Sequence, residues 1–287
     1  MHLKGLKFRE RNAGIKIDEH MTDNGFNNQI GVDPSTGFVF GGNVNNCGTW
    51  MDKMGSSSKA GNKGSPSSPR DGSAVEIVGL SYSCIKALAE LGPEVYSHQE
   101  VPVFGSLKAW ADTIRNNFDK YFWVGSKEGA EVEPHPELVN CVQMLKDSVS
   151  SGGQYTDYQL RCNYVIPLAI CPDISQNALP ALTTVTDLLL GPLGLATLHP
   201  GDWAYRGHYD NSNQSEDGSI AHGANYHQGP EWLWPVGFYL RALLNVTPIS
   251  EVFTTRYLVP LFTSYISGES QSGEAGSLPT LLSPGPV

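Results

Sequence analysis

Apolar side chains recur at helical spacing in several parts of the chain. Between residues 73 and 91 they fall at positions 74, 77, 78, 80, 84, 85, 88 and 91, which is the stripe of an amphipathic helix. Ser73 and Glu76 have the spacing of a capping box, and Gly92-Pro93 is a stop signal after the stripe. The pattern therefore predicts a helix over residues 73–91.

Four further segments show helical spacing, and they cover residues 107–123, 157–170, 178–190 and 230–245. In the first of them, Trp110, Ile114 and Phe118 share one face. In the second, Pro167 would kink the helix or end it early, because proline lacks the backbone N–H that a helix needs. These segments predict a chain built mainly from helices.

The remaining segments have no helical period. Residues 1–72 are rich in Gly, Asn and Asp with only short apolar pieces, and strand-like alternation is scarce. Residues 56–69 have the composition of a flexible loop, and the Gly/Ser/Pro bias of residues 267–287 predicts a disordered tail. Helices joined by long polar loops predict an all-α toroid or bundle with its chemistry on the loops.

Composition narrows the class of protein. The chain has 287 residues and a formal net charge of −10, which argues against nucleic acid as a partner because phosphate binding needs a basic face. It contains no run of 18 apolar residues and no apolar core of a signal peptide at its start. Five cysteines without a C-x-x-C motif indicate reduced thiols. We expect a cytoplasmic protein that binds neither nucleic acid nor membranes.

Three segments concentrate the polar and aromatic groups that hold sugars: residues 49–53, 69–76 and 225–234. In the first, Trp50 and Asp52 would point the same way if the segment is extended, so an indole could cover a sugar face beside an acid. The candidate site residues are Trp50, Asp52, Arg70, Asp71, Tyr226, His227, Gln228, Glu231 and Trp232.

Several of these residues also have a purely structural interpretation. Trp50 and Asp52 could be a half-buried indole and a capping acid of an ordinary loop. Glu76 and Asp71 could stabilise the start of the helix over residues 73–91. Glu231 follows Pro230 where a helix is expected to begin, and an acid is favoured there regardless of function. Trp232 and its neighbour Trp234 could simply belong to the core.

Cofactor chemistry is not expected. His208, His222 and His227 with Asp210 lack a metal-binding spacing such as H-E-x-x-H. The chain also lacks G-x-G-x-x-G, a Walker loop and G-x-S-x-G. The sequence therefore predicts no metal and no nucleotide cofactor.

Several ordered strings resemble the glucosidase portion of eukaryotic glycogen debranching enzymes. They are RERNAG (9–14), GGN (41–43), NCGTWMDKMG (46–55), PRDGSAVEIVGL (69–80), DYQLR (157–161), GPLG (191–194) and YHQGPEWLWP (226–235). The resemblance implies an (α/α)6 toroid of the glucoamylase-like kind that removes α-1,6-linked glucose from glycogen or limit dextrin with inversion. It also implies that Asp52 is the general acid and that Trp50 shapes the subsite beside it.

The same resemblance does not supply a general base. In the family the base lies in a G-L-P-E-L-T-N motif near the C-terminus, and Thr280 stands here in place of the Glu. The resemblance ends near residue 245, which predicts a partial glucosidase domain over residues 1–248 and a divergent tail over 249–287. The toroid would be incomplete at both ends, with its start and the glucanotransferase domain missing.

Two hypotheses follow from the missing base. The chain is either the glucosidase segment of a debranching enzyme, with weak activity when isolated, or a sugar-binding or structural remnant without catalysis.

Overall fold

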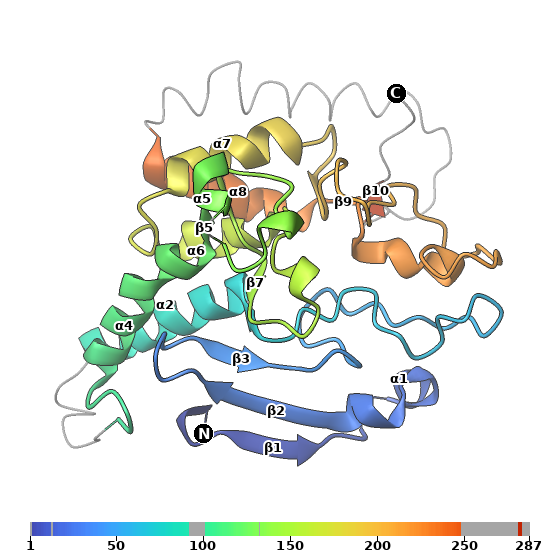
Figure 1. Cartoon of the computed structure of the whole chain (residues 1–287), viewed down its shortest axis with the longest axis horizontal. Coiled ribbons are helices and arrows are strands. Elements are labelled where there is room, and N and C mark those ends of the chain that lie inside the picture. The colour runs from blue at the N-terminus through green and yellow to red at the C-terminus, as the bar shows by residue number, and fades with distance from the viewer. Residues whose placement is uncertain (1, 13, 92–100, 132, 248–280, 283–287) are drawn as a thin grey trace.

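An antiparallel sheet forms the N-terminal edge of the molecule. The computed structural model describes residues 2–12, 14–91, 101–131, 133–247 and 281–282. Strands β1 (Leu6–Arg9), β2 (Asn27–Val32) and β3 (Val39–Gly41) pair in that order, beneath the helices in Figure 1. This sheet was not expected, because every residue of β1 is exposed and β2 carries mainly polar side chains. Backbone hydrogen bonds make the sheet, so hydrophobic alternation does not reveal it.

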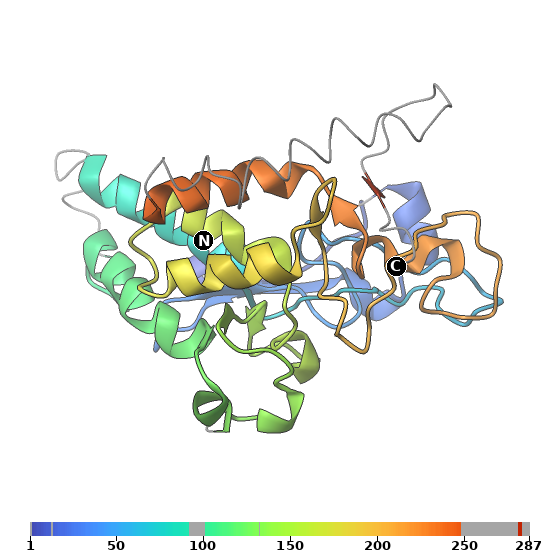
Figure 2. The ribbon, with the colours of Figure 1, turned by 90° about the horizontal axis from the view of Figure 1, so that it is seen from above.

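Five helices make up the helical body, and each packs on a neighbour in space. They are α2 (Val75–Leu91), α4 (Leu107–Phe122), α6 (Val165–Ile170), α7 (Ala178–Leu188) and α8 (Trp234–Val246). Helix α2 packs on α4 and α6, α6 packs on α8, and α8 packs on α7, as the two views of Figures 1 and 2 show. The chain is thus rich in helix, as the apolar spacing predicts.

The shorter elements connect this body. Two of them are the short α-helices α1 (Ile15–His20) and α5 (Lys127–Glu131). The 3-10 turns are His2–Lys4, Asp23–Phe26, Pro136–Leu138, Gln154–Thr156, Cys162–Tyr164 and Ala221–His227. The short strands pair as β4 (Ser73–Ala74) with β7 (Ser148–Val149), β5 (Trp123–Val124) with β6 (Met144–Leu145), and β9 (Glu231–Trp232) with both β8 (Leu195–Ala196) and β10 (Leu281–Leu282).

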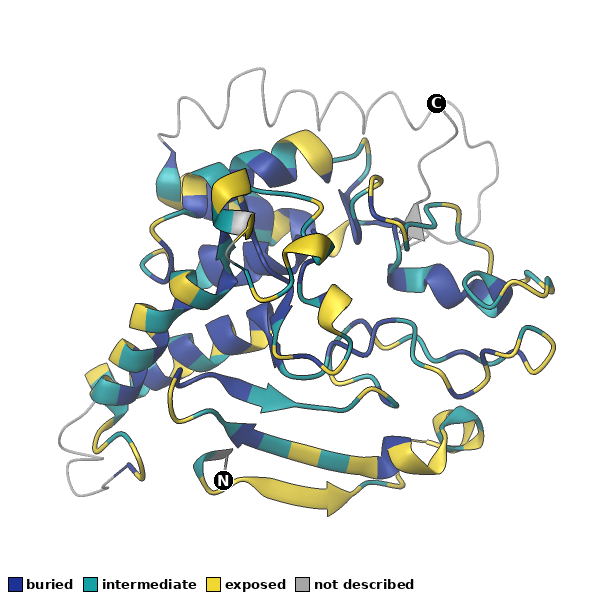
Figure 3. Ribbon diagram, viewed as in Figure 1, coloured by how far each residue is buried: buried dark blue, intermediate teal, exposed yellow. Residues whose placement is uncertain are grey.

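Helix α4 follows the predicted pattern closely. Its N-cap Ser106 accepts a hydrogen bond from the backbone N–H of Ala109, as a capping serine should. Trp110, Ile114 and Phe118 are buried on one face. Figure 3 shows this division between a buried and an exposed side along the helix.

Three predicted helix starts are wrong. Helix α2 begins at Val75, because Ser73 pairs with Val149 in a short ladder and the capping box does not form. Helix α6 begins only at Val165, so Pro167 lies in its first turn, where a missing N–H costs little. Helix α8 begins at Trp234, and Glu231 belongs to a strand.

Two further expectations concern the C-terminal tail and membrane-spanning helices. The predicted tail over residues 249–287 lies outside the described residues, apart from the two residues of β10. Where the structure describes the chain, no helix combines the length and apolar character that crossing a membrane requires.

The contact between α2 and α6 depends on Gly79. A Cβ atom at this position would lie 2.3 Å from the Cβ and 2.9 Å from the Cα of Pro167. Contacts this short cannot be kept, and the Cα of Pro167 cannot move without shifting α6. The small residue therefore lets the two helices approach closely.

We predict that Gly79→Ala destabilises the fold by about 1–3 kcal/mol, since overpacking a well-packed contact typically costs this much. Gly237→Ala is the matched control, because Gly237 lies in the exposed interior of α8 and an added Cβ meets nothing within 4 Å. The control should be neutral or stabilising by up to about 1 kcal/mol, from helix propensity alone. Urea unfolding measures both, and equal effects of the two substitutions would contradict the packing argument.

Candidate active site

A buried guanidinium lies beneath the candidate site. Arg70 Nε donates to Asp147 Oδ2 at 2.5 Å, and its two terminal nitrogens donate to the Glu76 carboxylate at 2.5 and 2.6 Å. A further bond runs from Arg70 to the hydroxyl of Thr49 at 3.0 Å. All three charged side chains are buried, and the two carboxylates raise the pKa of Arg70 even though burial lowers it.

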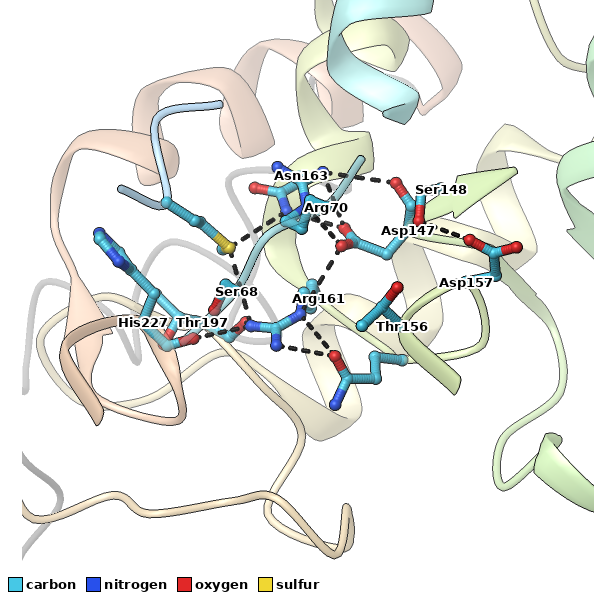
Figure 4. Close-up of polar contacts among 12 residues, drawn as sticks. Ser68, Arg70, Asp147, Ser148, Thr156, Asp157, Arg161, Asn163, Thr197 and His227 are labelled. Carbon is cyan, nitrogen blue, oxygen red and sulfur yellow. Dashed lines mark hydrogen bonds and ion pairs between the residues drawn. The ribbon is translucent and has the colours of Figure 1, made fainter. Parts of the chain in front are cut away.

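A second buried arginine holds the turn that carries several candidates. Arg161 donates to the backbone carbonyl of His227 at 2.7 Å and to the side-chain oxygen of Gln228 at 2.7 Å. It also lies 3.6 Å from Asp147 Oδ2, which joins it to the Arg70 cluster, as Figure 4 shows. Burial and the nearby charge of Arg70 lower the pKa of Arg161, and Asp147 opposes the shift.

An asparagine connects this buried layer to Trp50. Asn163 donates to Asp147 Oδ1 at 2.8 Å, and its own side-chain oxygen accepts a hydrogen bond from the Trp50 indole N–H at 2.8 Å. The fully buried Met51 lies beside it, and the Met51 sulfur accepts weak bonds from Asn163 and Arg161. The segment directly before Asp52 is thus fixed from below.

Four of the predicted residues gather in one aromatic cluster, which consists of Trp50, Tyr226, His227, Trp232 and Trp234. Trp50 meets the rings of His227, Trp232 and Trp234 edge to face, at centroid distances of 5.1, 5.5 and 4.8 Å. His227 and Trp232 stack at 5.2 Å with an interplanar angle of 18°. Tyr226 lies 4.9 Å from the Trp232 ring. Such faces suit the C–H side of a sugar ring.

Asp52 is exposed, and it follows Trp50 of the aromatic cluster by two residues and the buried Met51 by one. Its charge acts on two neighbours. Burial, and then the Asp52 carboxylate, raise the pKa of Cys47 to about 12, so this thiol stays protonated. Burial lowers the pKa of Lys53 while Asp52 partly opposes the shift. Lys53 also lies 5.8 Å from the Tyr226 ring centroid and donates to Asn211.

The other predicted residues lie deeper or elsewhere. The polar atoms of Arg70 and Gln228 are hydrogen-bonded to other parts of the protein. Arg70 bonds to Asp147 and Glu76, and the Gln228 amide nitrogen donates to Ser67 and Ser68. Asp71 lies before the short strand β4 that precedes α2, and its Oδ2 accepts a hydrogen bond from the N–H of Gly152 at 2.9 Å.

Glu231 has a different environment from the one predicted. It is buried in β9 rather than at a helix start, and its carboxylate accepts the N–H of Leu193 at 3.0 Å. Burial raises its pKa, which the N–H groups of Leu193 and Gly194 partly counter. The bare backbone of Gly191 lies against this carboxylate, because a Cβ there would meet Oε1 at 1.9 Å.

Sequence reasoning missed Asp147, Asn163 and the role of Arg161. Asp147 lies 77 residues from Arg70, and Asn163 lies 113 residues from Trp50. The string that contains Arg161 was noticed, but no spacing along the chain indicates that these groups meet. Asp147 lies in the two-residue link between β6 and β7, where the sequence does not distinguish it from any other loop acid.

Two further features bear on ligands. Within the described ranges, no group of three His, Cys, Asp or Glu side chains is arranged to hold a metal ion. A cleft of about 600 Å³ between the sheet and α2 is lined mainly by apolar residues, among them Ile30, Phe40, Ile77 and Leu80. It reaches Thr49, but Trp50 and Asp52 do not line it, so it is separate from the aromatic cluster.

A helix-rich chain with an exposed carboxylate beside clustered aromatic side chains has the features of a carbohydrate-active protein. The family model described as amylo-alpha-1,6-glucosidase matches residues 1–279, and the chain belongs to this family. The match continues past residue 245, so the family extends further along the chain than the sequence strings alone indicated.

The chain is similar to the glycogen debranching enzyme of Saccharomyces cerevisiae (strain ATCC 204508 / S288c). The two are 43% identical over 251 residues, which cover 84% of this chain. The same region is 16% of the yeast protein, so the chain spans only a small part of that relative's length.

The environment of His227 predicts a pH dependence of stability. Burial, followed by the charges of Arg161, Arg70 and Lys53, lowers the pKa of His227 to about 3. The unfolded chain therefore takes up this proton below about pH 6.5, whereas the folded chain does not until about pH 3. Stability should fall as the pH decreases through this window, by up to about 1.4 kcal/mol per pH unit from this group.

Urea unfolding at pH 7 and pH 5 tests this, with His227→Gln as the variant. The variant should lose less stability than the unchanged chain between the two pH values. An identical loss in both proteins would contradict the assignment of the shift to His227.

Proposed function

We propose that this chain is the glucose-releasing segment of a glycogen debranching enzyme, which hydrolyses α-1,6-linked glucose at the branch points of glycogen or limit dextrin. Membership in the amylo-alpha-1,6-glucosidase family and the 43% identity to the yeast enzyme support this substrate class. The net charge of −10 suits a neutral polysaccharide better than a polyanion.

The observation that carries the proposal is the placement of Asp52. Its carboxylate is exposed, whereas Met51 before it is fully buried and Trp50 is fixed by Asn163. An acid on such a fixed segment reaches a bound glycosidic oxygen without rearrangement. Asp52 would donate the proton that lets the leaving sugar depart.

The aromatic cluster would form the glucose subsite. Trp50, Tyr226 and Trp232 are half-buried, so part of each ring is open to a ligand. The buried Arg70, His227 and Glu231 would shape the subsite from beneath without touching the sugar. Gln228, with both ends of its amide bonded to protein, would belong to this supporting layer. Asp71 is half-buried and has an oxygen without a partner among the described residues.

Inversion also requires a base about 6.5–9.5 Å from the acid, with a water between them. The position expected to supply it, Thr280, lies outside the described residues. A threonine hydroxyl does not accept a proton from water at neutral pH. We therefore expect slow turnover by this chain alone, since a positioned base typically contributes about 10²–10⁴-fold.

The remaining assignments concern architecture and compartment. Successive packing of α4, α2, α6, α8 and α7 is compatible with part of an (α/α)6 toroid. The apolar cleft between the sheet and α2 would take a further segment of the longer protein as its neighbour. All five cysteines are free thiols, which favours the reducing cytoplasm as the compartment.

Removing the acid should abolish glucose release. We predict that Asp52→Asn lowers the rate on a branched limit dextrin by about 10²–10⁴-fold, because the amide cannot donate an acidic proton. Asp112→Asn is the matched control, since Asp112 is an exposed acid on α4 paired only with Lys108. Retention of the rate in Asp52→Asn would contradict the acid assignment.

Saturable binding of maltose by an unchanged chain that releases no glucose would favour the non-catalytic sugar-binding alternative.

Replacing Glu231 should have a different effect. Its carboxylate is buried against the turn at residues 191–194. It therefore cannot take a proton from the water molecule that attacks the sugar. We predict that Glu231→Gln keeps turnover within about tenfold of the unchanged chain, with lower stability because a hydrogen-bonded buried acid is altered. Glucose release and urea unfolding are measured together. A loss as complete as that of Asp52→Asn, restored by external azide, would instead identify Glu231 as the base.

A further inference from the structure

A pair of exposed aromatic side chains lies apart from the aromatic cluster. Trp203 is 68% exposed and Tyr155 is 40% exposed, whereas the next most exposed tryptophan, Trp234, reaches 39%. The rings of Trp203 and Tyr155 lie 5.3 Å apart between centroids, at an interplanar angle of 63°. They come from two loops that are 48 residues apart in the sequence, and Tyr155 lies in the 3-10 turn Gln154–Thr156, in which Gln154 and Tyr155 are exposed and Thr156 is buried.

The loop that presents Trp203 is held firmly. The buried Asp202 accepts hydrogen bonds from the N–H of Ala204 at 2.8 Å and from the side chains of Asn140 and Gln159. The Trp203 carbonyl accepts a bond from Arg206 at 3.1 Å. An indole that is mostly in water contributes little hydrophobic stabilisation to the fold, yet the backbone that carries this one is fixed. This combination is expected of a surface that binds a ligand rather than of a mobile loop.

The chemistry of the ligand follows from the rings and the charge. Exposed aromatic rings stack on sugar faces and on nucleic-acid bases, but binding of single-stranded nucleic acid also needs a positively charged groove. The chain instead carries a net charge of −10, and the charged side chains beside the pair are the buried Asp202 and a single cation, Arg206. One arginine next to an acid does not make a basic groove. A neutral carbohydrate is therefore the ligand that fits.

The angle between the rings selects among carbohydrates. Two platforms tilted by 63° cannot both lie flat on a straight, ribbon-like β-1,4-linked chain. An α-1,4-linked chain is curved, with successive sugar rings tilted against each other, so each platform can take one face. We propose that Trp203 and Tyr155 form a second binding site for an α-1,4-linked glucan chain. The choice of glucan rests on the proposed function, since the outer chains of a branched glucan are of this type.

This site shares a support with the aromatic cluster. Gln159, which bonds to Asp202, also accepts from Arg161 at 2.8 Å, and Arg161 holds the turn of His227 and Gln228. The site could therefore hold one chain of a branched glucan while another enters the aromatic cluster, and both are fixed to one rigid layer. Binding of a second chain raises the effective concentration of the branch point.

Calorimetric titration of the 287-residue chain with maltoheptaose tests the proposal. Trp203→Ala and Tyr155→Ala should each weaken binding about tenfold, as truncation of an anchoring aromatic residue commonly does. Trp203→Phe should retain most of the affinity, because an aromatic face remains. Phe8→Ala is the matched control, since Phe8 is an exposed aromatic residue on β1 and its loss should change nothing.

The outcomes separate this site from the proposed function. Unchanged maltoheptaose affinity in both Trp203→Ala and Tyr155→Ala would overturn the second site, even if Asp52→Asn stops hydrolysis of a short branched oligosaccharide. Binding that depends on Trp203, in a chain that hydrolyses nothing, would support the second site while the hydrolytic function fails. Equal affinity for cellohexaose or for a single-stranded oligonucleotide would also overturn the proposal.

Discussion

The ion cluster of Arg70, Glu76 and Asp147 is the interaction on which the rest of the structure depends. A single guanidinium satisfies two buried carboxylates and the hydroxyl of Thr49. These partners belong to the loop before Trp50, the first turn of α2 and the segment between β6 and β7. Breaking such a buried pair by removing one partner typically costs about 3–5 kcal/mol, because the other charge is left without compensation.

The cluster also fixes a backbone that would otherwise be unfavourable. Arg70 has a φ of 44°, a left-handed conformation that few residues other than glycine adopt. Gly72 follows at a φ of 86°, and the chain turns sharply there into β4 and α2. The hydrogen bonds of the guanidinium compensate for this strain, so one side chain sets both the turn and the position of the helix. Planar, bidentate geometry makes arginine, rather than lysine, the residue suited to this role.

Two hydrogen-bonded connections extend from this cluster to the candidate site. One passes from Asp147 through Asn163 to the indole of Trp50, and the other passes through Arg161 to the turn of His227 and Gln228. Figure 4 shows the central part of both, from Asp147 to Asn163 and from Arg161 to His227. The two halves of the aromatic cluster, which are about 180 residues apart in sequence, are thereby held by one buried polar layer. A layer in which the donors and acceptors are largely satisfied is stiff, and in the proposed function this stiffness would position the exposed Asp52 for proton transfer.

The sequence by itself determined the helical body and the family. Helical spacing of apolar residues located α4 almost to the residue, because burial of one face follows directly from that period. The strings around Asp52 and His227 pointed to the glucosidase family to which the chain belongs, and their dense aromatic and polar groups predict a sugar site. Only the tertiary structure decided what these residues touch. Glu76 has the spacing of a cap but pairs with Arg70, and Glu231 precedes a helix but lies in a strand against Gly191. Local spacing reports local hydrogen bonds, whereas Asp147 and Asn163 find their partners through the packing of distant segments.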